Sequence, residues 1–247
     1  MKYMIQKIKK ILSVLFTLII VILLISSTNE NNKISNNFIL DMDSSFIDHA
    51  KLERILINEI DTNLTEFNFF DIENKIKLNP HVKDVKVFKD LIGNLNVDLI
   101  QYNPVARIVS GEFRDNYLDV NGNLFPISKD YSKRVILIHL PDNISYDNNS
   151  IFNSSFGEDL LKMINFINQD NFFNKIISEI DVDSNKNIVI HPFLSKQKII
   201  FGYPDMLEEK FNKISLFYNK IIPSKGWNTY KTVNVKFKDQ IICDKFS

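Results

Sequence analysis

The sequence predicts an α+β protein with an N-terminal transmembrane helix, a small unit of order β-α-α-β-β, and a larger β-rich domain with a few helices. Three observations predict this arrangement. Residues 11–27 are almost wholly apolar, residues 45–79 place apolar side chains at helical spacing, and apolar and polar residues alternate in most later segments. Alternation of this kind is typical of strands that bury one face.

The composition narrows the classes of function. Lys+Arg and Asp+Glu number 30 each, so no overall charge favours a nucleic-acid partner. A hydrophobic content of 45% in 247 residues is enough for a packed core in one or two domains. The single cysteine, Cys243, excludes an internal disulfide and a cysteine-based metal site.

The apolar segment at residues 11–27 has the length of a membrane span. Seventeen helical residues cover about 26 Å, close to the roughly 30 Å of hydrocarbon in a bilayer. Four lysines lie within residues 1–10 and only Lys33 follows closely, which by the positive-inside rule predicts a cytoplasmic N-terminus. A cleaved signal peptide is the alternative, because small residues (Ser26, Ser27) follow the apolar run.

The segment after the span predicts a strand and two helices. The strand covers residues 36–41, and Ser45 with Asp48 resembles a capping box at the start of the first helix. A second helix begins near Asp71 and ends before Pro80, because the residue preceding proline is driven out of the α region. The expected buried positions on these helices are Leu52, Ile55, Leu56, Ile60, Ile72 and Ile76.

Two strands follow, separated by a turn around Gly93. Val85 and Val87 alternate with charged or exposed positions in the first, and Leu95, Val97 and Leu99 do so in the second. The result is a three-stranded sheet covered by two helices on one face, a core of about 70 residues.

The remaining chain predicts strands with two amphipathic helices. Strands are expected over residues 104–109, on both sides of the Asn121-Gly122 turn, over 134–140, in a hairpin spanning 176–192, over 196–202 and over 230–243. One helix is expected to begin with Ser155 and Glu158 as a capping box and to bury Leu160, Leu161, Ile164 and Ile167. The other is expected to start near Leu207, to bury Phe211, Ile214, Phe217 or Tyr218, and Ile221, and to stop at Pro223.

No catalytic, cofactor-binding or metal-binding motif is predicted. The histidines (His49, His81, His139, His191) lie on unrelated elements. Residues 181–187 resemble the start of a calcium loop, but Lys186 stands where the turn needs glycine and Pro192 where a bidentate glutamate is needed. A polar hairpin turn is therefore favoured there, and Asp115 and Asp119 are interpreted as turn residues instead of a carboxylate pair.

The element order just outside a single span resembles a POTRA (polypeptide-transport-associated) domain. Residues 78–108, "LNPHVKDVKVFKDLIGNLNVDLIQYNPVARI", resemble the segment that leaves this domain in the FtsQ/DivIB family of bacterial cell-division proteins. The segments at residues 117–135 and 226–245 are similar to segments nearer the C-terminus in members of the same family. The resemblance divides the chain into a cytoplasmic tail (1–10), a transmembrane helix (11–27), a stalk with a POTRA domain (28–103) and an FtsQ-type β domain (104–247).

The resemblance implies a non-enzymatic divisome scaffold without cofactors. Such a protein sits in the cell inner membrane with a single span and holds its bulk in the periplasmic or extracytoplasmic space. It links early and late division proteins at the septum, through FtsB- and FtsL-like partners and through further division proteins that dock on the POTRA domain. The alternatives are a POTRA-type protein that handles unfolded or outer-membrane proteins, and an anchored envelope enzyme.

The last strand is the expected docking site for an FtsB-like chain. As the last element, the strand from Thr232 to Phe237 is expected to expose a free edge that another strand extends, and the resemblance implies the same use. The alternative is that this strand only completes the core. The expected partner-binding residues are Thr232, Val233, Asn234, Val235, Lys236, Phe237, Lys238, Asp239, Ile241 and Ile242.

Overall fold

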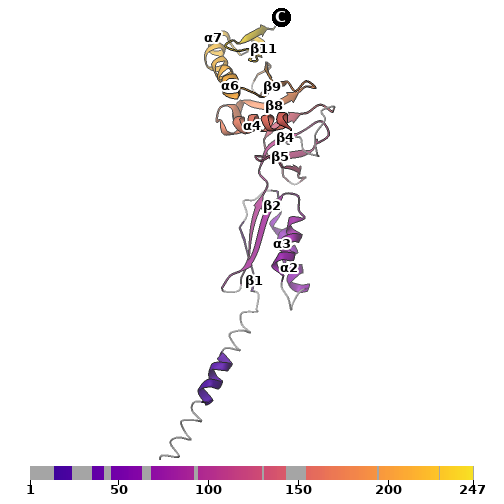
Figure 1. Cartoon of the computed structure of the whole chain (residues 1–247), viewed down its shortest axis with the longest axis vertical. Coiled ribbons are helices and arrows are strands. Elements are labelled where there is room, and N and C mark those ends of the chain that lie inside the picture. The colour runs from indigo at the N-terminus through magenta and orange to yellow at the C-terminus, as the bar shows by residue number, and fades with distance from the viewer. Residues whose placement is uncertain are drawn as a thin grey trace, which may run out of the picture. The chain divides into compact units, whose positions relative to one another are not determined.

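The chain divides into two compact units, residues 1–101 and 102–247. A computed structural model describes residues 14–23, 35–41, 46–62, 68–91, 94–129, 131–142, 154–193, 195–227 and 229–246 (Figure 1). Residues 14–23 are helical, and the rest of the predicted span at 11–27 lies outside the described residues. Within the described ranges, no helix is both long and apolar enough to cross a membrane.

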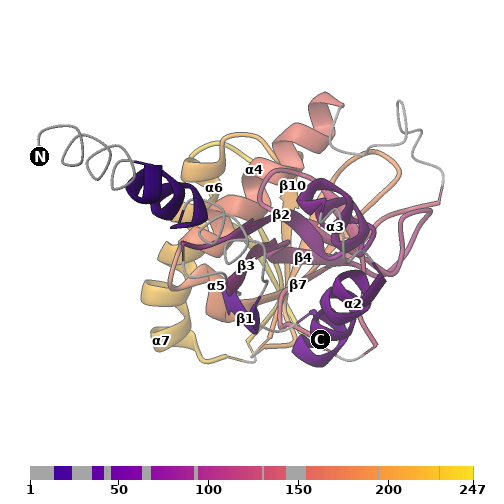
Figure 2. The ribbon, with the colours of Figure 1, turned by 90° about the horizontal axis from the view of Figure 1, so that it is seen from below.

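The first unit has the predicted order β-α-α-β-β. Strand β3 lies in the middle of a three-stranded sheet, parallel to β1 and antiparallel to β2. Helices α2 and α3 lie on one side of this sheet (Figure 1) and next to each other (Figure 2). The elements are β1 (Ser35–Asp41), α2 (His49–Thr62), α3 (Phe69–Lys77), β2 (Val82–Lys89) and β3 (Asn94–Gln101).

The core of the first unit comes from the alternation predicted for β2 and β3. Val87 pairs with Val97 across the two strands, and Val85 pairs with Leu99. All of the described apolar positions that were expected inside are buried except Ile55, which is half-buried; the buried ones are Leu52, Leu56, Ile72, Ile76, Val85, Val87, Leu95, Val97 and Leu99. The side chain of Ile60 is not among those described, and Gly93 lies outside the described residues.

Each of the two helices begins with a polar side chain that accepts a backbone N–H group, which is the type of start that the sequence predicts for α2. Asp48 Oδ1 accepts the Ala50 N–H at 3.0 Å, at the start of α2, whereas Ser45 lies outside the described residues. Asn68 caps α3 by accepting the Phe70 N–H at 3.1 Å. Such caps satisfy backbone donors that have no partner within the helix.

The second unit is built on a sheet of nine described strands. Their order is β12-β11-β10-β9-β8-β7-β4-β5-β6. The strands are β4 (Pro104–Ile108), β5 (Asn116–Asp119), β6 (Leu124–Pro126), β7 (Ile136–His139), β8 (Ile177–Val182), β9 (Ile188–Pro192), β10 (Lys198–Gly202), β11 (Tyr230–Asn234) and β12 (Ile242–Lys245). The helical segments are α4 (Ser155–Gln169), α5 (Phe173–Ile176), α6 (Leu207–Leu216), the π-helix η3 (Phe217–Ile221) and α7 (Ile222–Lys225).

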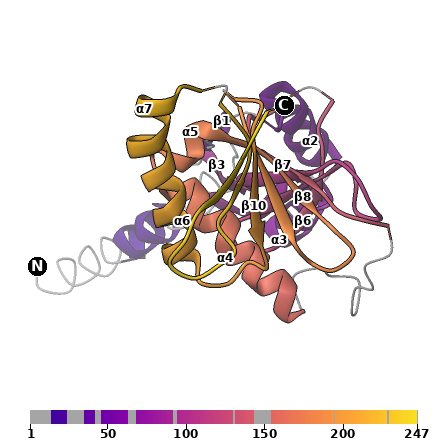
Figure 3. The same ribbon diagram turned by 90° about the horizontal axis from the view of Figure 1, so that it is seen from above.

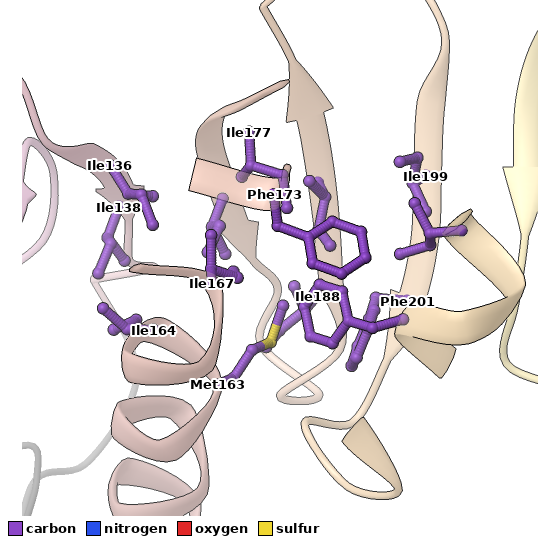
Figure 4. Close-up of a cluster of buried hydrophobic side chains, with 14 of the residues drawn as sticks. Ile136, Ile138, Met163, Ile164, Ile167, Phe173, Ile177, Ile188, Ile199 and Phe201 are labelled. Atoms are coloured by element: carbon purple, nitrogen blue, oxygen red, sulfur yellow. The ribbon is translucent and has the colours of Figure 1, made fainter. Parts of the chain in front are cut away.

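The core of the second unit lies between the sheet and the helices on one side of it (Figure 3). Strands β7 to β10 point isoleucine and phenylalanine side chains at Met163, Ile164 and Ile167 of α4 (Figure 4). Phe211 of α6 is 1% exposed, and its ring centroid lies 4.7 Å from those of Phe166 and Phe173. Side chains of α4 and α6 belong to the same buried cluster, so both helices pack against the same face of the sheet.

Two helix boundaries differ from the prediction. Ser154, not Ser155, caps α4 by accepting the Gly157 N–H at 3.1 Å, because the pair of adjacent serines offers two caps one residue apart. Pro223 does not stop the second helix, which continues to Lys225. The wider π-turn η3 precedes it and Pro223 falls in the first turn of α7, where a missing N–H costs little.

An aspartate side chain organises each of the hairpin turns at residues 119–123 and 183–187. Asp119 is buried, and its Oδ1 accepts the N–H groups of Asn121 and Asn123. Asp183 Oδ1 likewise accepts the N–H groups of Asn185 and Asn187. These carboxylates therefore hold turns, which supports the polar-hairpin interpretation of residues 181–187.

Candidate functional site

The two ends of the large sheet differ in what they offer to another chain. At one end, β6 has only three residues and finishes with Pro126, which has no N–H. At the other end, β12 pairs with β11 on one side, and no described strand pairs with its other side. An unpaired strand edge carries backbone donors and acceptors that a further strand can satisfy. We call the unpaired side of Ile242–Lys245 the β12 edge.

The predicted free edge at Thr232–Phe237 is wrong in its position. Strand β11 ends at Asn234 and lies inside the sheet, parallel to β10 and antiparallel to β12. Asn234 Oδ1 accepts the Lys236 N–H at 3.0 Å, which turns the backbone out of the ladder. The chain then folds back at Asp239, whose φ is +56°, and returns as β12 along the edge that was expected to be free.

The residues predicted to bind a partner have three kinds of position in the structure. Val233 and Val235 are fully buried in the core, as their alternation predicted. Ile241 packs partly on the core and Ile242 begins β12. The others lie beside β12 on β11 or on the exposed turn before it: Thr232, Asn234, Lys236, Phe237, Lys238 and Asp239.

Strand β12 extends beyond the predicted strand at 230–243, since Asp244 and Lys245 were not included in it. The strand is short and was merged with β11 into one predicted strand. The signal that separates the two is polar residues 238–240 followed by the apolar pair Ile241-Ile242. Thr232 Oγ1 donates to Asp244 Oδ2 at 2.5 Å, which ties the two strands together by side chains.

The backbone geometry of β12 identifies which groups face outward. Phe246 N–H donates to Thr229 O at 3.3 Å, directly next to the Lys245–Tyr230 pair, and a bond at this position belongs to a ladder in which that pair does not itself exchange hydrogen bonds. In an antiparallel ladder, bonded and non-bonded pairs alternate along the strand. The N–H and C=O groups of Lys245, and two residues earlier those of Cys243, therefore point to the unpaired side.

A shallow hollow of about 590 Å³ lies beside the turn that leads into β12. Helix α6 forms one wall and the turn forms the other. Leu216 of α6 is 51% exposed, and Phe237 on the turn is 46% exposed, so large apolar side chains remain uncovered in this region. The lining residues are Glu209, Asn212, Lys213, Leu216, Asp239, Gln240 and Ile241.

Lys213 fixes the turn to helix α6. Its Nζ donates to Phe237 O at 2.6 Å and to Val235 O at 3.3 Å, and it lies 2.8 Å from Glu209 Oε1. The hydrogen bond from Lys213 holds the pKa of the Glu209 carboxyl below its usual range. One lysine therefore positions the turn, and through it the start of β12.

Lys236 crosses the sheet surface at a glycine. Gly202, at the end of β10, has φ +79°, and a side-chain carbon added there would lie 2.7 Å from Lys236 Cγ. Glycine is needed at this position both for the backbone conformation and for the close approach of the lysine stem. The stem of Lys236 is thus held against β10, while the residue as a whole stays exposed.

The ionisable groups of the described region do not form a reactive cluster. Burial raises the pKa of the Cys243 thiol above its ordinary value, so the thiol stays protonated at neutral pH. His191 Nε2 lies 2.7 Å from Asp181 Oδ2, and His139 Nε2 lies 3.6 Å from Glu179 Oε2, as separate pairs between neighbouring strands. Within the residues described, no three His, Cys, Asp or Glu side chains gather where they could hold a metal.

Comparison with known proteins identifies the region that holds this site. No curated protein matches the chain. The family model described as "FtsQ/DivIB, C-terminal related" matches residues 103–244, which run from just before β4 into β12 and make up more than half of the 247 residues. The resemblance read from the sequence is thereby confirmed, and the chain belongs to the FtsQ/DivIB, C-terminal related family.

Proposed function

We propose that the protein is a non-enzymatic scaffold of the cell-division machinery, which links early and late division proteins through extracytoplasmic contacts. Membership of the FtsQ/DivIB, C-terminal related family supports a role in cell division with other division proteins as partners. FtsB- and FtsL-like proteins are the proposed partners of the second unit. The unpaired β12 edge, which lies at the C-terminal end of the matched region and extends one residue beyond it, is the single observation that carries this proposal.

An FtsB-like chain would add a strand to the β12 edge. The outward N–H and C=O groups of Cys243 and Lys245 supply backbone hydrogen bonds, which give affinity with little dependence on sequence. Specificity would come from the neighbouring side chains. Lys236 and Lys238 attract acidic residues, and the hollow beside Leu216 accepts an apolar side chain of the partner.

Removal of β12 is expected to abolish capture of the partner. The test compares the full chain with a truncation after Gln240, each co-expressed with FtsB- and FtsL-like proteins. A truncation after Lys245 is the matched control, because it shortens the chain but keeps β12. Co-purification is expected to survive the control truncation and to disappear with the longer one, while both variants still melt cooperatively. Retention of the partner without β12 would place the docking site elsewhere.

The first unit is proposed to be a POTRA domain that docks further division proteins. Its described elements have the β-α-α-β-β order on which the resemblance rests. Both outer strands of its sheet, β1 and β2, have one side without a described neighbouring strand. Each of them therefore offers an edge to which a partner could add a strand.

The proposed topology has one retained span at residues 11–27 and a cytoplasmic N-terminus in the cell inner membrane. The lysines before the apolar segment motivate it. A reporter that is active only outside the cytoplasm is expected to be active when fused after residue 40, and the full-length N-terminus is expected to persist in the mature protein. A mature protein that starts near Ser27 would instead identify a cleaved signal peptide.

A further inference from the structure

A second hollow, which we call the basic groove, lies away from the β12 edge. It has a volume of about 500 Å³ and is lined by Ser132–Leu137, which lead into β7, and by residues of α5 and of the start of β8. Its size falls within the roughly 300–1,000 Å³ of typical ligand sites. Four strand spacings separate β8 from β12 in the sheet, or about 19 Å, so the two sites are distinct.

The groove concentrates positive charge in a chain that has no net charge. Four cationic side chains line it, from Arg107, Lys133, Arg134 and Lys175, and one carboxylate does, from Glu179. Four positive charges and one negative charge leave a formal charge of +3 on the lining, whereas the whole chain sums to zero. A hollow lined by one sign of charge focuses its electric field on ligands of the opposite sign.

Most of these cations have no carboxylate partner in the described part of the chain. No ion pair forms there at Arg134 or Lys175, and Lys133 Nζ donates to the neutral amide oxygen of Asn103. Arg107 Nη2 lies 3.6 Å from Asp115 Oδ1, a long contact, and its buried Nε has no acceptor among the described residues. The guanidinium and ammonium groups therefore retain capacity for an incoming anion.

Apolar side chains share the groove with the cations. Phe193 is 62% exposed, and the Arg134 guanidinium lies 4.9 Å from the centre of its ring. Leu137 and Val135 are half-buried along the same segment. A simple anion would leave this apolar surface exposed to water, whereas a ligand with both charged and apolar groups would cover it.

We propose that the basic groove binds an acidic peptide segment in which carboxylates flank an apolar side chain. The carboxylates would take hydrogen bonds from Arg134 and Lys175 at the exposed rim and reach Arg107 deeper in the groove. The apolar side chain would pack on Phe193, beside the guanidinium. Six consecutive residues, Ser132–Leu137, line the groove, and the last two belong to strand β7, which suits a ligand that is itself an extended peptide.

The test uses the full chain and a fluorescein-labelled peptide with glutamates on both sides of a phenylalanine. Fluorescence anisotropy measures its affinity for the unmodified chain and for the variant Arg134→Glu with Lys175→Glu. Both residues are exposed, so the fold is expected to persist. The double variant is expected to weaken binding by about tenfold or more, because two attractive charges become repulsive. Phe193→Ala is expected to weaken it by about threefold while every charge remains.

The matched control is Lys196→Glu with Lys220→Glu, which makes the same change of net charge at two exposed lysines outside the groove. It is expected to change affinity by less than about twofold at ordinary ionic strength, because screening limits distant charges. Equal losses from both double variants, or no binding to the unmodified chain, would overturn the proposal. Tripolyphosphate that competes with the peptide while Phe193→Ala has no effect would overturn it too, since the groove would then accept any polyanion.

Discussion

Replacement of Val97 by aspartate is expected to unfold the first unit. Val97 lies in the central strand β3, is 1% exposed and pairs with Val87. A carboxylate at this position would be buried without a partner, which costs on the order of 4 kcal/mol and approaches the whole stability of a small unit. Hydrogen exchange of the full chain measures this, with loss of protection expected over residues 82–101 and retention of protection over β7 to β10.

Ile100→Asp is the matched control for this change. Ile100 lies on the same strand, three residues after Val97, and is 57% exposed. Side chains alternate between the two faces of a strand, so an odd separation places Ile100 on the opposite face from Val97. Its replacement by aspartate is expected to leave the protection of β2 and β3 nearly unchanged. If Ile100→Asp unfolded the unit and Val97→Asp did not, the assigned faces of the strand would be reversed.

The first unit was predictable because its interactions are local. Buried apolar residues alternate at Val85 and Val87 in β2 and over Leu95–Leu99 in β3, and in α3 they recur four residues apart at Ile72 and Ile76. These spacings indicate both the type of element and its buried face. The parallel pairing of β1 with β3 joins residues far apart in the sequence. No local pattern specifies such a pairing, and it depends on the chain crossing over through α2 and α3.

The helix ends were less predictable, because competing local signals differ by small energies. Two adjacent serines made the cap of α4 ambiguous by one residue. Pro223 is a strong stop signal, yet the preceding π-turn shifts the register so that the proline falls in a first turn. A π-turn has no simple sequence signature, so this exception could not be seen in advance.

The sequence predicted the buried positions near the C-terminus, but it did not predict that the chain forms two strands there. The alternation of Val233 and Val235 correctly indicated buried positions. The backbone leaves the ladder because of the Asn234 side chain and because of Lys213, which binds Phe237 O from 24 residues earlier in the chain. The second of these contacts is non-local, so the separation of β11 from β12 was hidden in the sequence.

The separation of β11 from β12 changes which residues would contact a partner in the proposed scaffold role. Thr232 and Asn234 are already paired within the sheet, so they support β12 and do not receive the partner strand. The partner would instead meet the backbone of Cys243 and Lys245. Lys213 acquires a positioning role, since the turn that it holds determines where β12 begins.

Lys245→Pro is expected to weaken partner binding while the domain stays folded. The Lys245 N–H points away from β11, so its loss removes no hydrogen bond of the sheet, and proline is tolerated on an edge strand. An added strand would lose this N–H and would meet the proline ring. The expected loss of affinity is about tenfold or more, or roughly 1.4 kcal/mol or more.

Lys245→Ala is the control that distinguishes the effect of the backbone N–H from the effect of the lysine side chain. Both variants lose the side chain, but only the proline variant loses the N–H. The affinity of the FtsB-like partner for the full chain is measured for the two variants, with thermal melting as the check on folding. Strand addition at the β12 edge predicts that Lys245→Ala binds nearly as tightly as the unmodified chain and that Lys245→Pro binds about tenfold more weakly or worse. Equal affinities for the two folded variants would contradict it.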